Sequence, residues 1–270
     1  MQERPPRLDV KVAIVTGAGS SGPGVGTGEA IAVLFAREGC QVLLADVVTA
    51  RAEETLATIR AEGGEAFVEQ VDVTRSDDCR RMVDAAVSRY GRLDILVNNV
   101  GILATGNVVG VDEGDWDRVV DTNLKSMMLT GKHAIPVMIE GGGGAIINLA
   151  SFMGLRAGYD TEPVAYSASK GGVIALTTAM ASEHGRANVR VNAIAPGYLY
   201  TPMVADNISE ELRDLRRTSA PLGTEGTAWD VAWAAVYLAS DEARWVTGVT
   251  LPVDAGILAT SPLAMFRHMT

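Results

Sequence analysis

Short apolar runs alternate along the chain with longer stretches in which apolar residues recur every three or four positions. The first run, Val12–Thr16, is rich in β-branched residues and stops at a glycine, which is typical of a buried strand. Runs of this kind predict strands at 12–16, 42–45, 66–71, 93–98, 145–150, 189–195 and 250–253. The helical periodicity between them predicts helices at 29–38, 50–62, 77–90, 115–138, 166–184, 209–217 and 228–240.

This alternation predicts the fold class. Continuous apolar strands separated by helices favour an α/β fold with a doubly wound, Rossmann-like parallel sheet of about seven strands and helices on both faces. No internal repeat and no linker rich in Pro, Gly or Ser divides the sequence. We therefore expect one domain over 1–270, with its core at 10–256, a substrate lid at 198–226 and a C-terminal tail at 257–270.

Charge and cysteine content narrow the partners and the compartment. The net charge of −10 argues against nucleic acid and against an anionic membrane surface. No apolar run is long enough to span a bilayer and no signal peptide is visible, so a cytoplasmic protein is expected. Cys40 and Cys79 are interpreted as buried residues in a reducing compartment. His133, His184 and His268 are scattered, so no metal site is expected.

A glycine-rich segment follows the first strand. It reads TGAGSSGPGVGTGEA and contains six glycines before the next helix. Glycines in this place let the backbone approach a pyrophosphate at the helix N-terminus, although glycine also serves plain turns. Asp46 closes the second strand, where a carboxylate accepts hydrogen bonds from ribose hydroxyls and repels a 2′-phosphate, or simply caps the next helix. No Lys or Arg lies between Gly17 and Gly28. NAD, rather than NADP, is the expected cofactor.

A second group of polar residues favours acid/base chemistry. Tyr166 and Lys170 are four positions apart, so they share one helix face, a spacing that is also common on plain helix surfaces. A nearby ammonium favours the phenolate, so the pKa of Tyr166 is expected to fall toward the neutral range. Ser151 follows the fifth strand, and Asn99 and Gly101 follow the fourth. Parallel strands bind ligands at their carboxyl ends, so these side chains are expected to converge there.

Together these motifs resemble the short-chain dehydrogenase/reductase family, from about Val10 to Gly256. The motifs that carry the resemblance are TGAGSSGPGVGTG, Asp72-Val73, Asn98-Asn99-Val100-Gly101, Asn123, Asn148–Ser151, Tyr166-x-x-x-Lys170 and Pro196-Gly197. The resemblance implies hydride transfer between NAD and a secondary alcohol or ketone. It also implies a homotetramer, for which the apolar tail residues Leu258, Leu263, Met265 and Phe266 would offer contact surface.

The resemblance implies a role for each matching residue. Tyr166 would be the general acid/base, Lys170 would hold the nicotinamide ribose, and Ser151 would bind the substrate oxygen. Asn123 would hold a water beside Lys170, or would merely face solvent. Asp72 and Val73 would lie at the adenine, Asn99 on the adenosine side and Thr201 at the carboxamide. The substrate would contact Ser151, Tyr166 and Tyr198. The other implied cofactor contacts are Gly17, Gly19, Gly26, Thr27, Gly28, Asp46, Gly101, Pro196 and Gly197.

The sequence departs from the family pattern in three places. The glycine loop is longer than usual, and Val100 replaces the usual alanine. The segment between Ser151 and Tyr166 is also longer. Three charged residues in that segment could reach the substrate, but solvated charges are the expected interpretation of them. These residues are Arg156, Asp160 and Glu162.

Three functions stay open at this point. The first is an NAD-dependent dehydrogenase for a mid-sized secondary alcohol, since Phe152, Met153 and Leu199 give an apolar pocket. The second is a reductase of 3-oxoacyl thioesters on an acidic carrier protein. Such an enzyme would need a basic docking face for its carrier protein and would usually use NADPH. The net charge of −10 argues against the docking face, and Asp46 argues against NADPH. The third is a dinucleotide-binding sensor or scaffold without turnover, in which loss of Tyr166 or Lys170 would be expected.

Overall fold

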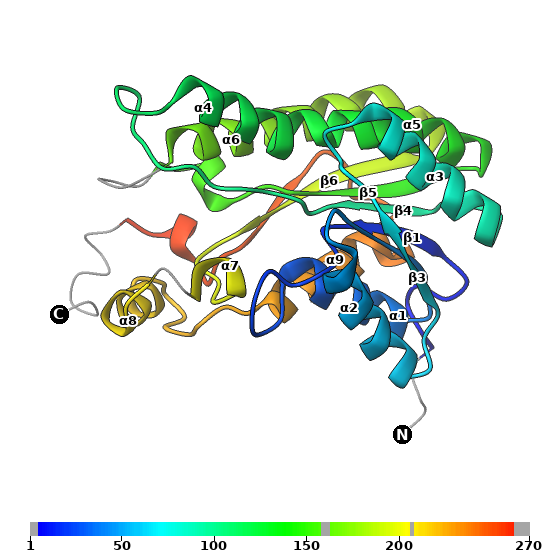
Figure 1. Cartoon of the computed structure of the whole chain (residues 1–270), viewed down its shortest axis with the longest axis horizontal. Coiled ribbons are helices and arrows are strands. Elements are labelled where there is room, and N and C mark those ends of the chain that lie inside the picture. Colours follow the sequence, from blue (N-terminus) through cyan, green and yellow to red (C-terminus); the bar gives the residue numbers. More distant parts are fainter. Residues whose placement is uncertain (1–4, 158–162, 206–207, 262–270) are drawn as a thin grey trace.

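The protein is built on one seven-stranded sheet in which every strand pairing is parallel (Figure 1). The computed structural model describes residues 5–157, 163–205 and 208–261. The strand order is β3-β2-β1-β4-β5-β6-β7, which confirms the predicted doubly wound, Rossmann-like fold. The strands are β1 (Val12–Thr16), β2 (Gln41–Asp46), β3 (Ala66–Gln70), β4 (Ile95–Asn98), β5 (Gly144–Leu149), β6 (Val189–Pro196) and β7 (Thr250–Val253).

Helices cover both faces of the sheet (Figure 1). Side chains alternate along each strand, so Ala13 and Val15 of β1 pack in the apolar cluster on one face while Ile14 packs in the cluster on the other. The first face carries α1 (Thr27–Arg37), α2 (Thr49–Ala61) and α9 (Ala228–Ala239). The second face carries α3 (Ser76–Tyr90), α4 (Glu113–Val120), α5 (Ser126–Glu140) and α6 (Val164–His184).

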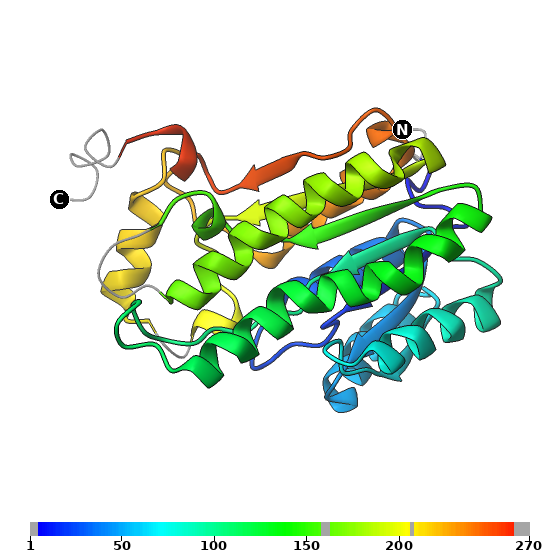
Figure 2. The same cartoon turned by 90° about the horizontal axis from the view of Figure 1, so that it is seen from above.

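The crevice for a ligand follows from the strand order. From β1 the chain winds outward to β2 and β3, then returns to β4 on the other side of β1. The loops after β1 and β4 therefore diverge at the carboxyl edge of the sheet, where open α/β sheets bind their ligands. The helices of the predicted lid, α7 (Pro202–Ala205) and α8 (Glu210–Thr218), lie beyond this edge (Figure 2).

Two helices differ from the sequence prediction. The long helix expected at 115–138 is present as α4 and α5, which are joined by a π-helical turn at Asp121–Lys125. Its apolar periodicity is continuous, so the pattern did not reveal the change of winding. The short helix α7 was not predicted, because four residues are too few for a periodic signal.

A buried polar network ties the two central strands to the helices above them. The Asn98 amide donates to Oδ1 of Asn148 at 2.8 Å, and the Asn148 amide donates to Oγ1 of Thr177 at 3.0 Å. The Thr130 hydroxyl donates to Oδ1 of Asn98 at 2.7 Å. All four side chains are buried. Asn98 is therefore a cross-strand connector in the sheet interior.

The segment after β5 and the start of the tail are joined by Arg156. Its guanidinium donates to the carbonyl oxygens of Leu258 and Thr260 at 3.3 and 3.1 Å. Arg156 is exposed, as expected of a solvated charge, and it also binds the backbone of the returning chain. The remaining expectations for this region concern residues outside the described part of the chain, namely Asp160, Glu162, Leu263, Met265 and Phe266. None of the helices in the described residues is long and apolar enough to cross a membrane.

Candidate active site

Two adjoining cavities lie at the carboxyl edge of the sheet, with volumes of about 380 and 540 Å³. They share wall residues, so one elongated ligand can occupy both; the shared residues are Thr27, Asn99, Gly101, Thr201 and Met203. The first cavity brings together Gly17, Gly19, Gly26, Thr27, Gly28, Asp46, Asp72, Val73, Asn99, Gly101 and Thr201. The second brings together Ser151, Tyr166, Lys170, Pro196, Gly197 and Tyr198.

The glycines of the first cavity form a cradle that a Cβ would fill. Gly17 has φ +62°, which favours glycine. A Cβ on Gly28 would lie 1.9 Å from the carbonyl oxygen of Gly17, and a Cβ on Gly19 would lie 2.4 Å from Cβ of Arg51. The Asn99 amide donates to the carbonyl oxygens of Thr16 and Gly17 and holds this turn against β4. The exposed backbone before α1 fits the pyrophosphate of a dinucleotide.

The lengthened part of the glycine loop folds back on itself and meets the lid. The Ser20 hydroxyl is 2.9 Å from the carbonyl oxygens of both Gly22 and Gly24. A Cβ on Gly22 or Gly24 would lie 3.6 or 3.7 Å from the side chain of Pro202 in α7. The extra residues thus lie against α7, while Ser21 lines the first cavity.

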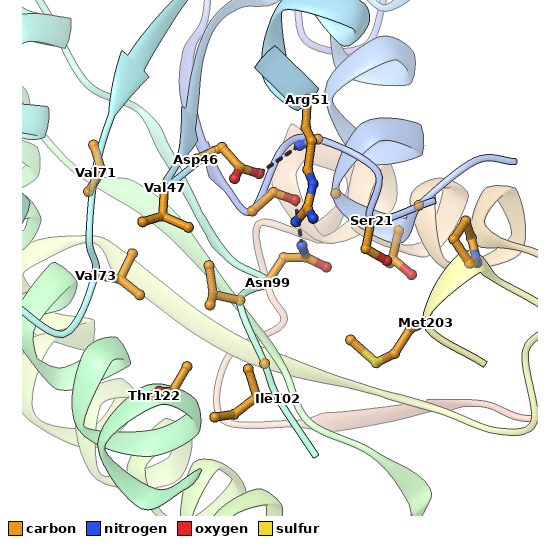
Figure 3. Close-up of a pocket in the computed structure, with 18 of the residues that line it drawn as sticks. Ser21, Asp46, Val47, Arg51, Val71, Val73, Asn99, Ile102, Thr122 and Met203 are labelled. Carbon is orange, nitrogen blue, oxygen red and sulfur yellow. Dashed lines mark hydrogen bonds between the residues drawn. The ribbon is translucent and has the colours of Figure 1, made fainter. Parts of the chain in front are cut away.

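Asp46 and an unpredicted cation, Arg51, share the far end of the first cavity (Figure 3). Asp46 is 8% exposed, and its two oxygens accept from the backbone amides of Gly19 and Val48 at 3.0 and 2.9 Å. Arg51 comes from the first turn of α2 and makes no ion pair with Asp46, both residues being described. The glycine loop itself lacks a cation, as the sequence indicates, but a cation lies at the same end of the cavity. Helix α2 supplies one.

Asp72 and Val73 line the same cavity after β3. The Asp72 carboxylate accepts from the backbone amide and the hydroxyl of Thr74, at 3.0 and 2.6 Å. This fixes the turn and leaves Val73 as an apolar wall of the cavity. Such a wall suits a flat apolar ring, which agrees with the adenine position that the resemblance implies.

The three residues with the strongest chemical signal meet in the second cavity. Tyr166 and Lys170 lie one turn apart on α6, with the Lys170 ammonium 5.5 Å from the centre of the Tyr166 ring. Ser151 follows β5, and its hydroxyl hydrogen-bonds the Tyr166 side chain. Gly154 fixes their spacing, because a Cβ there would lie 2.6 Å from the backbone of Lys170. The turn after β5 therefore packs directly on α6.

Burial shifts both ionisable groups. Lys170 is 3% exposed and donates to the carbonyl oxygen of Leu149 at 2.6 Å. Burial lowers the pKa of Lys170 to about 8. Burial raises the pKa of Tyr166, and the Ser151 hydrogen bond opposes this only in part. The expected fall in the pKa of Tyr166 is therefore wrong for the protein alone, because desolvation of the phenolate dominates.

Asn123 lies beside these residues in the π-helical turn but lines neither cavity. It is fully buried, so the solvent-facing alternative is wrong. Its oxygen accepts from the amide of Ile102 at 2.8 Å, and its amide donates to the carbonyl of Ile102 and the hydroxyl of Ser169. Asn123 thus anchors the loop after β4 to α6. π-Helical turns of this kind often mark functional sites.

Sequence reasoning missed three residues of this region: Arg51, Gly154 and Arg216. Nothing in the local pattern marks Arg51 or Gly154, since their positions depend on packing between distant segments. Arg216 carried a usable signal. It shares a helical face with Leu212, Leu215 and Ser219, and all four line the second cavity.

Comparisons with known proteins identify relatives over most of the chain. A family model described as "Enoyl-(Acyl carrier protein) reductase" matches residues 23–258. The 3-oxoacyl-[acyl-carrier-protein] reductase of Thermotoga maritima is 36% identical over 252 residues, 93% of this chain and 99% of that protein. The mitochondrial borneol dehydrogenase of Lavandula x intermedia is 41% identical over 255 residues, 93% of this chain and 92% of that protein.

Solved structures match over nearly the whole length. A protein from Burkholderia xenovorans, described as a short-chain dehydrogenase/reductase, has a TM-score of 0.90 and 44% identity, covering 95% of this chain and 99% of that chain. A 7α-hydroxysteroid dehydrogenase complexed with NADH and 7-oxo glycochenodeoxycholic acid has a TM-score of 0.87 and 32% identity, covering 93% and 96%. The chain therefore belongs to the short-chain dehydrogenase/reductase family, whose members are oxidoreductases that bind a nicotinamide cofactor.

Proposed function

We propose that this protein is an NAD(H)-dependent dehydrogenase of secondary alcohols, with Tyr166 as the general acid/base. One observation carries the proposal: Ser151, Tyr166 and Lys170 face a single cavity that adjoins a glycine cradle fitted to a dinucleotide. Apolar side chains form much of the rest of that cavity, including Phe152 and Leu199. This lining suits a mid-sized secondary alcohol or ketone.

Each catalytic residue has a defined task in the oxidative direction. NAD, when bound, supplies the hydride acceptor. Ser151 hydrogen-bonds the substrate oxygen and the Tyr166 hydroxyl, so it aligns one with the other. Tyr166 takes the hydroxyl proton on its phenolic oxygen. Lys170 would hold the nicotinamide ribose, and its charge favours the phenolate that the reaction needs. Asn123 keeps the loop carrying Gly101 against α6, and in our proposal it also orders the water beside Lys170.

The experiment that tests this function is a screen of secondary alcohols and ketones with NAD(H). Tyr166→Phe removes the proton acceptor and keeps the ring, so turnover should fall by about 10²-fold or more. NAD affinity should stay near normal in that variant. If Tyr166→Phe keeps more than about a tenth of the activity, Tyr166 is not the base. A protein that binds NAD(H) tightly and turns over no substrate would instead support the sensor or scaffold alternative.

The NAD preference is a separate proposal, supported by Asp46. Its carboxylate lines the adenosine end of the cavity and would repel a 2′-phosphate. We expect at least about tenfold higher kcat/KM with NAD than with NADP, or about 1.4 kcal/mol. Asp46→Ser should raise activity with NADP, because it leaves the Arg51 guanidinium without a nearby anion. Asp46→Ser combined with Arg51→Ala should lose that gain. Equal kcat/KM with both cofactors in the unmutated enzyme would show that Asp46 does not contact the adenosine ribose.

A 3-oxoacyl thioester reductase is the second candidate. Relatives carrying that name and the Arg51 guanidinium in the first cavity favour it, since such reductases usually use NADPH. Asp46 and the net charge of −10 favour the alcohol dehydrogenase. The discriminating assay compares a 3-oxoacyl thioester plus NADPH with a cyclic ketone plus NADH. A higher kcat/KM for the thioester pair would select the second candidate.

Assembly and location complete the proposal. We propose a homotetramer whose contacts include the exposed apolar side chains of Trp233 and Tyr237 on α9 and of Trp245 after it, which is 92% exposed.

Two buried, unpaired cysteines, Cys40 and Cys79, support a cytoplasmic location. The segment at 198–226 would act as the lid, and neither nucleic acid nor a membrane is a proposed partner.

A further inference from the structure

Helix α8 carries three arginines that differ in their partners. Arg213 makes two hydrogen bonds to the Glu225 carboxylate, at 2.6 and 2.7 Å. Arg217 donates to the Asp214 carboxylate at 2.6 Å. For Arg216, the described part of the chain provides no carboxylate within ion-pair distance. Among the described residues, Arg216 is therefore the one of these three arginines that has no carboxylate partner.

Arg216 belongs to the face of α8 that borders the second cavity. That face repeats at helical spacing and consists of Leu212, Leu215, Arg216 and Ser219. Leu212 and Leu215 are 41% and 40% exposed because the cavity lies open beside them. The lid helix thus presents an apolar surface with one guanidinium to whatever occupies the cavity.

A cation–π contact with Tyr198 orients Arg216. Its guanidinium carbon lies 5.0 Å from the centre of the Tyr198 ring. Tyr198 in turn packs edge-on against Phe152, with ring centres 4.9 Å apart. A guanidinium that is oriented by stacking loses less freedom when it binds an anion.

The charges around the second cavity are unbalanced. Among its described wall residues, Lys170 and Arg216 are cations and none is Asp or Glu. Lys170 already donates a hydrogen bond to the Leu149 carbonyl and lies beside Tyr166, so Arg216 is the cation that a distant part of the substrate could reach. In a chain with net charge −10, this excess of positive charge among the described wall residues favours an anion in the cavity.

The acidic residues on the other side of Arg216 already have partners. Arg216 also borders a smaller cavity lined by Glu225, Asp230 and Asp254. Glu225 is bound by Arg213, Asp230 accepts from the amide and hydroxyl of Thr227, and Asp254 accepts from the amides of Gly256 and Leu258. Glu225 is neutralised by Arg213, whereas Asp230 and Asp254 keep their charge, but none of the three forms an ion pair with Arg216. The Arg216 guanidinium is therefore available to a ligand on the side of the second cavity.

We infer that the substrate is a hydroxy or oxo acid whose carboxylate binds Arg216 while its carbinol or carbonyl group meets Ser151 and Tyr166. One guanidinium matches one carboxylate in charge and in bidentate geometry, whereas a phosphate dianion would keep charge uncompensated. The apolar faces of Leu212 and Leu215 would contact the carbon frame between the two ends. This inference rests on the proposed function and adds the substrate class to it.

The test uses matched alcohols that differ only in charge. The probes are 4-hydroxycyclohexanecarboxylate, its homologues with longer acid arms, and the methyl ester of each. The unmutated enzyme should favour the best acid over its ester at least about tenfold in kcat/KM, as expected for a hydrogen bond to a charged group. Arg216→Gln should abolish this preference by raising KM for the acid, with the ester unaffected. Arg216→Lys should restore part of it.

Arg217→Gln is the matched control on the same helix, and it should behave as the unmutated enzyme. Calorimetric binding of the keto acid to the enzyme with NAD adds a readout without turnover, in which Arg216→Gln should weaken affinity about tenfold or more. Equal use of acid and ester, or the same loss in Arg217→Gln, would overturn the inference. If esters are oxidised in a Tyr166-dependent manner without any acid preference, the proposed function stands and only this inference fails.

Discussion

Replacing Lys170 with methionine should stabilise the protein while destroying its activity. Lys170 is 3% exposed, and burial lowers its pKa from the ordinary 10.5 to about 8. A shift of this size means that the charged form of Lys170 lowers the free energy of unfolding by about 3 kcal/mol. The variant also loses the hydrogen bond to the Leu149 carbonyl, which costs about 1 kcal/mol of stability. At pH 7, Lys170→Met should therefore be more stable by about 2 kcal/mol.

The pH dependence gives the sharper test. Above pH 8 the folded protein releases the Lys170 proton, whereas the unfolded chain keeps it until about pH 10.5. The unfolded state then binds more protons, so the stability of the unmutated protein rises with pH in this window. Between pH 8 and 9.5, the free energy of unfolding of the unmutated protein should rise by about 2 kcal/mol relative to that of Lys170→Met, because each pH unit contributes about 1.4 kcal/mol.

The assay is urea unfolding of cofactor-free protein at pH 7, 8 and 9.5. The free-energy difference between the two proteins should shrink across this range. Lys125→Met is the control, because Lys125 is 52% exposed and pairs with Asp121 on the surface. Its stability at the same three pH values is the reference against which the Lys170→Met values are compared. A Lys170→Met protein that is less stable at pH 7, or a stability difference that does not change with pH, would contradict this prediction.

Three further predictions concern the cradle, the polar network and assembly. Gly28→Ala should weaken NAD binding at least about tenfold in a calorimetric titration, because its Cβ would collide with the Gly17 carbonyl, while Gly185→Ala, with open space around it, should bind normally. Asn148→Ala should lower the free energy of unfolding in urea by about 2–4 kcal/mol, because it leaves the buried Asn98 amide without its acceptor and removes the hydrogen bond to Thr177; a loss under about 1 kcal/mol would contradict this. Light scattering should show four subunits at micromolar concentration and smaller species for Trp233→Ser combined with Trp245→Ser. A stable, active monomer of the unmutated chain would exclude the tetramer.

The sequence predicted those parts of the molecule that depend on local pattern. Continuous apolar runs such as Val12–Thr16 identify the buried strands, and the series of glycines between β1 and α1 indicates the cradle. The pairing of Tyr166 with Lys170 follows from helical spacing alone. These features need only near neighbours in the chain, so the pattern of residues contains them.

Other features depend on segments that meet only in the folded chain. Arg51 enters the cofactor cavity because Gly19 packs on the first turn of α2, and no local signal encodes that approach. The pKa of Tyr166 was misjudged for a similar reason. The sequence shows the neighbouring ammonium, but the desolvation that outweighs it comes from the walls that surround both residues. The π-helical turn at Asn123 is hidden because one extra residue per turn barely disturbs the apolar period.

The network of Asn98, Thr130, Asn148 and Thr177 also restricts how the chain can change over evolutionary time. Each side chain satisfies a neighbour in the sheet interior, so a single replacement leaves a buried group unpaired. Replacing both members of a pair by apolar residues of the same shape can be nearly neutral. A lineage in which both members of a pair become apolar must therefore pass through a less stable single mutant. The same four positions should resist drift individually and change, when they do, in pairs.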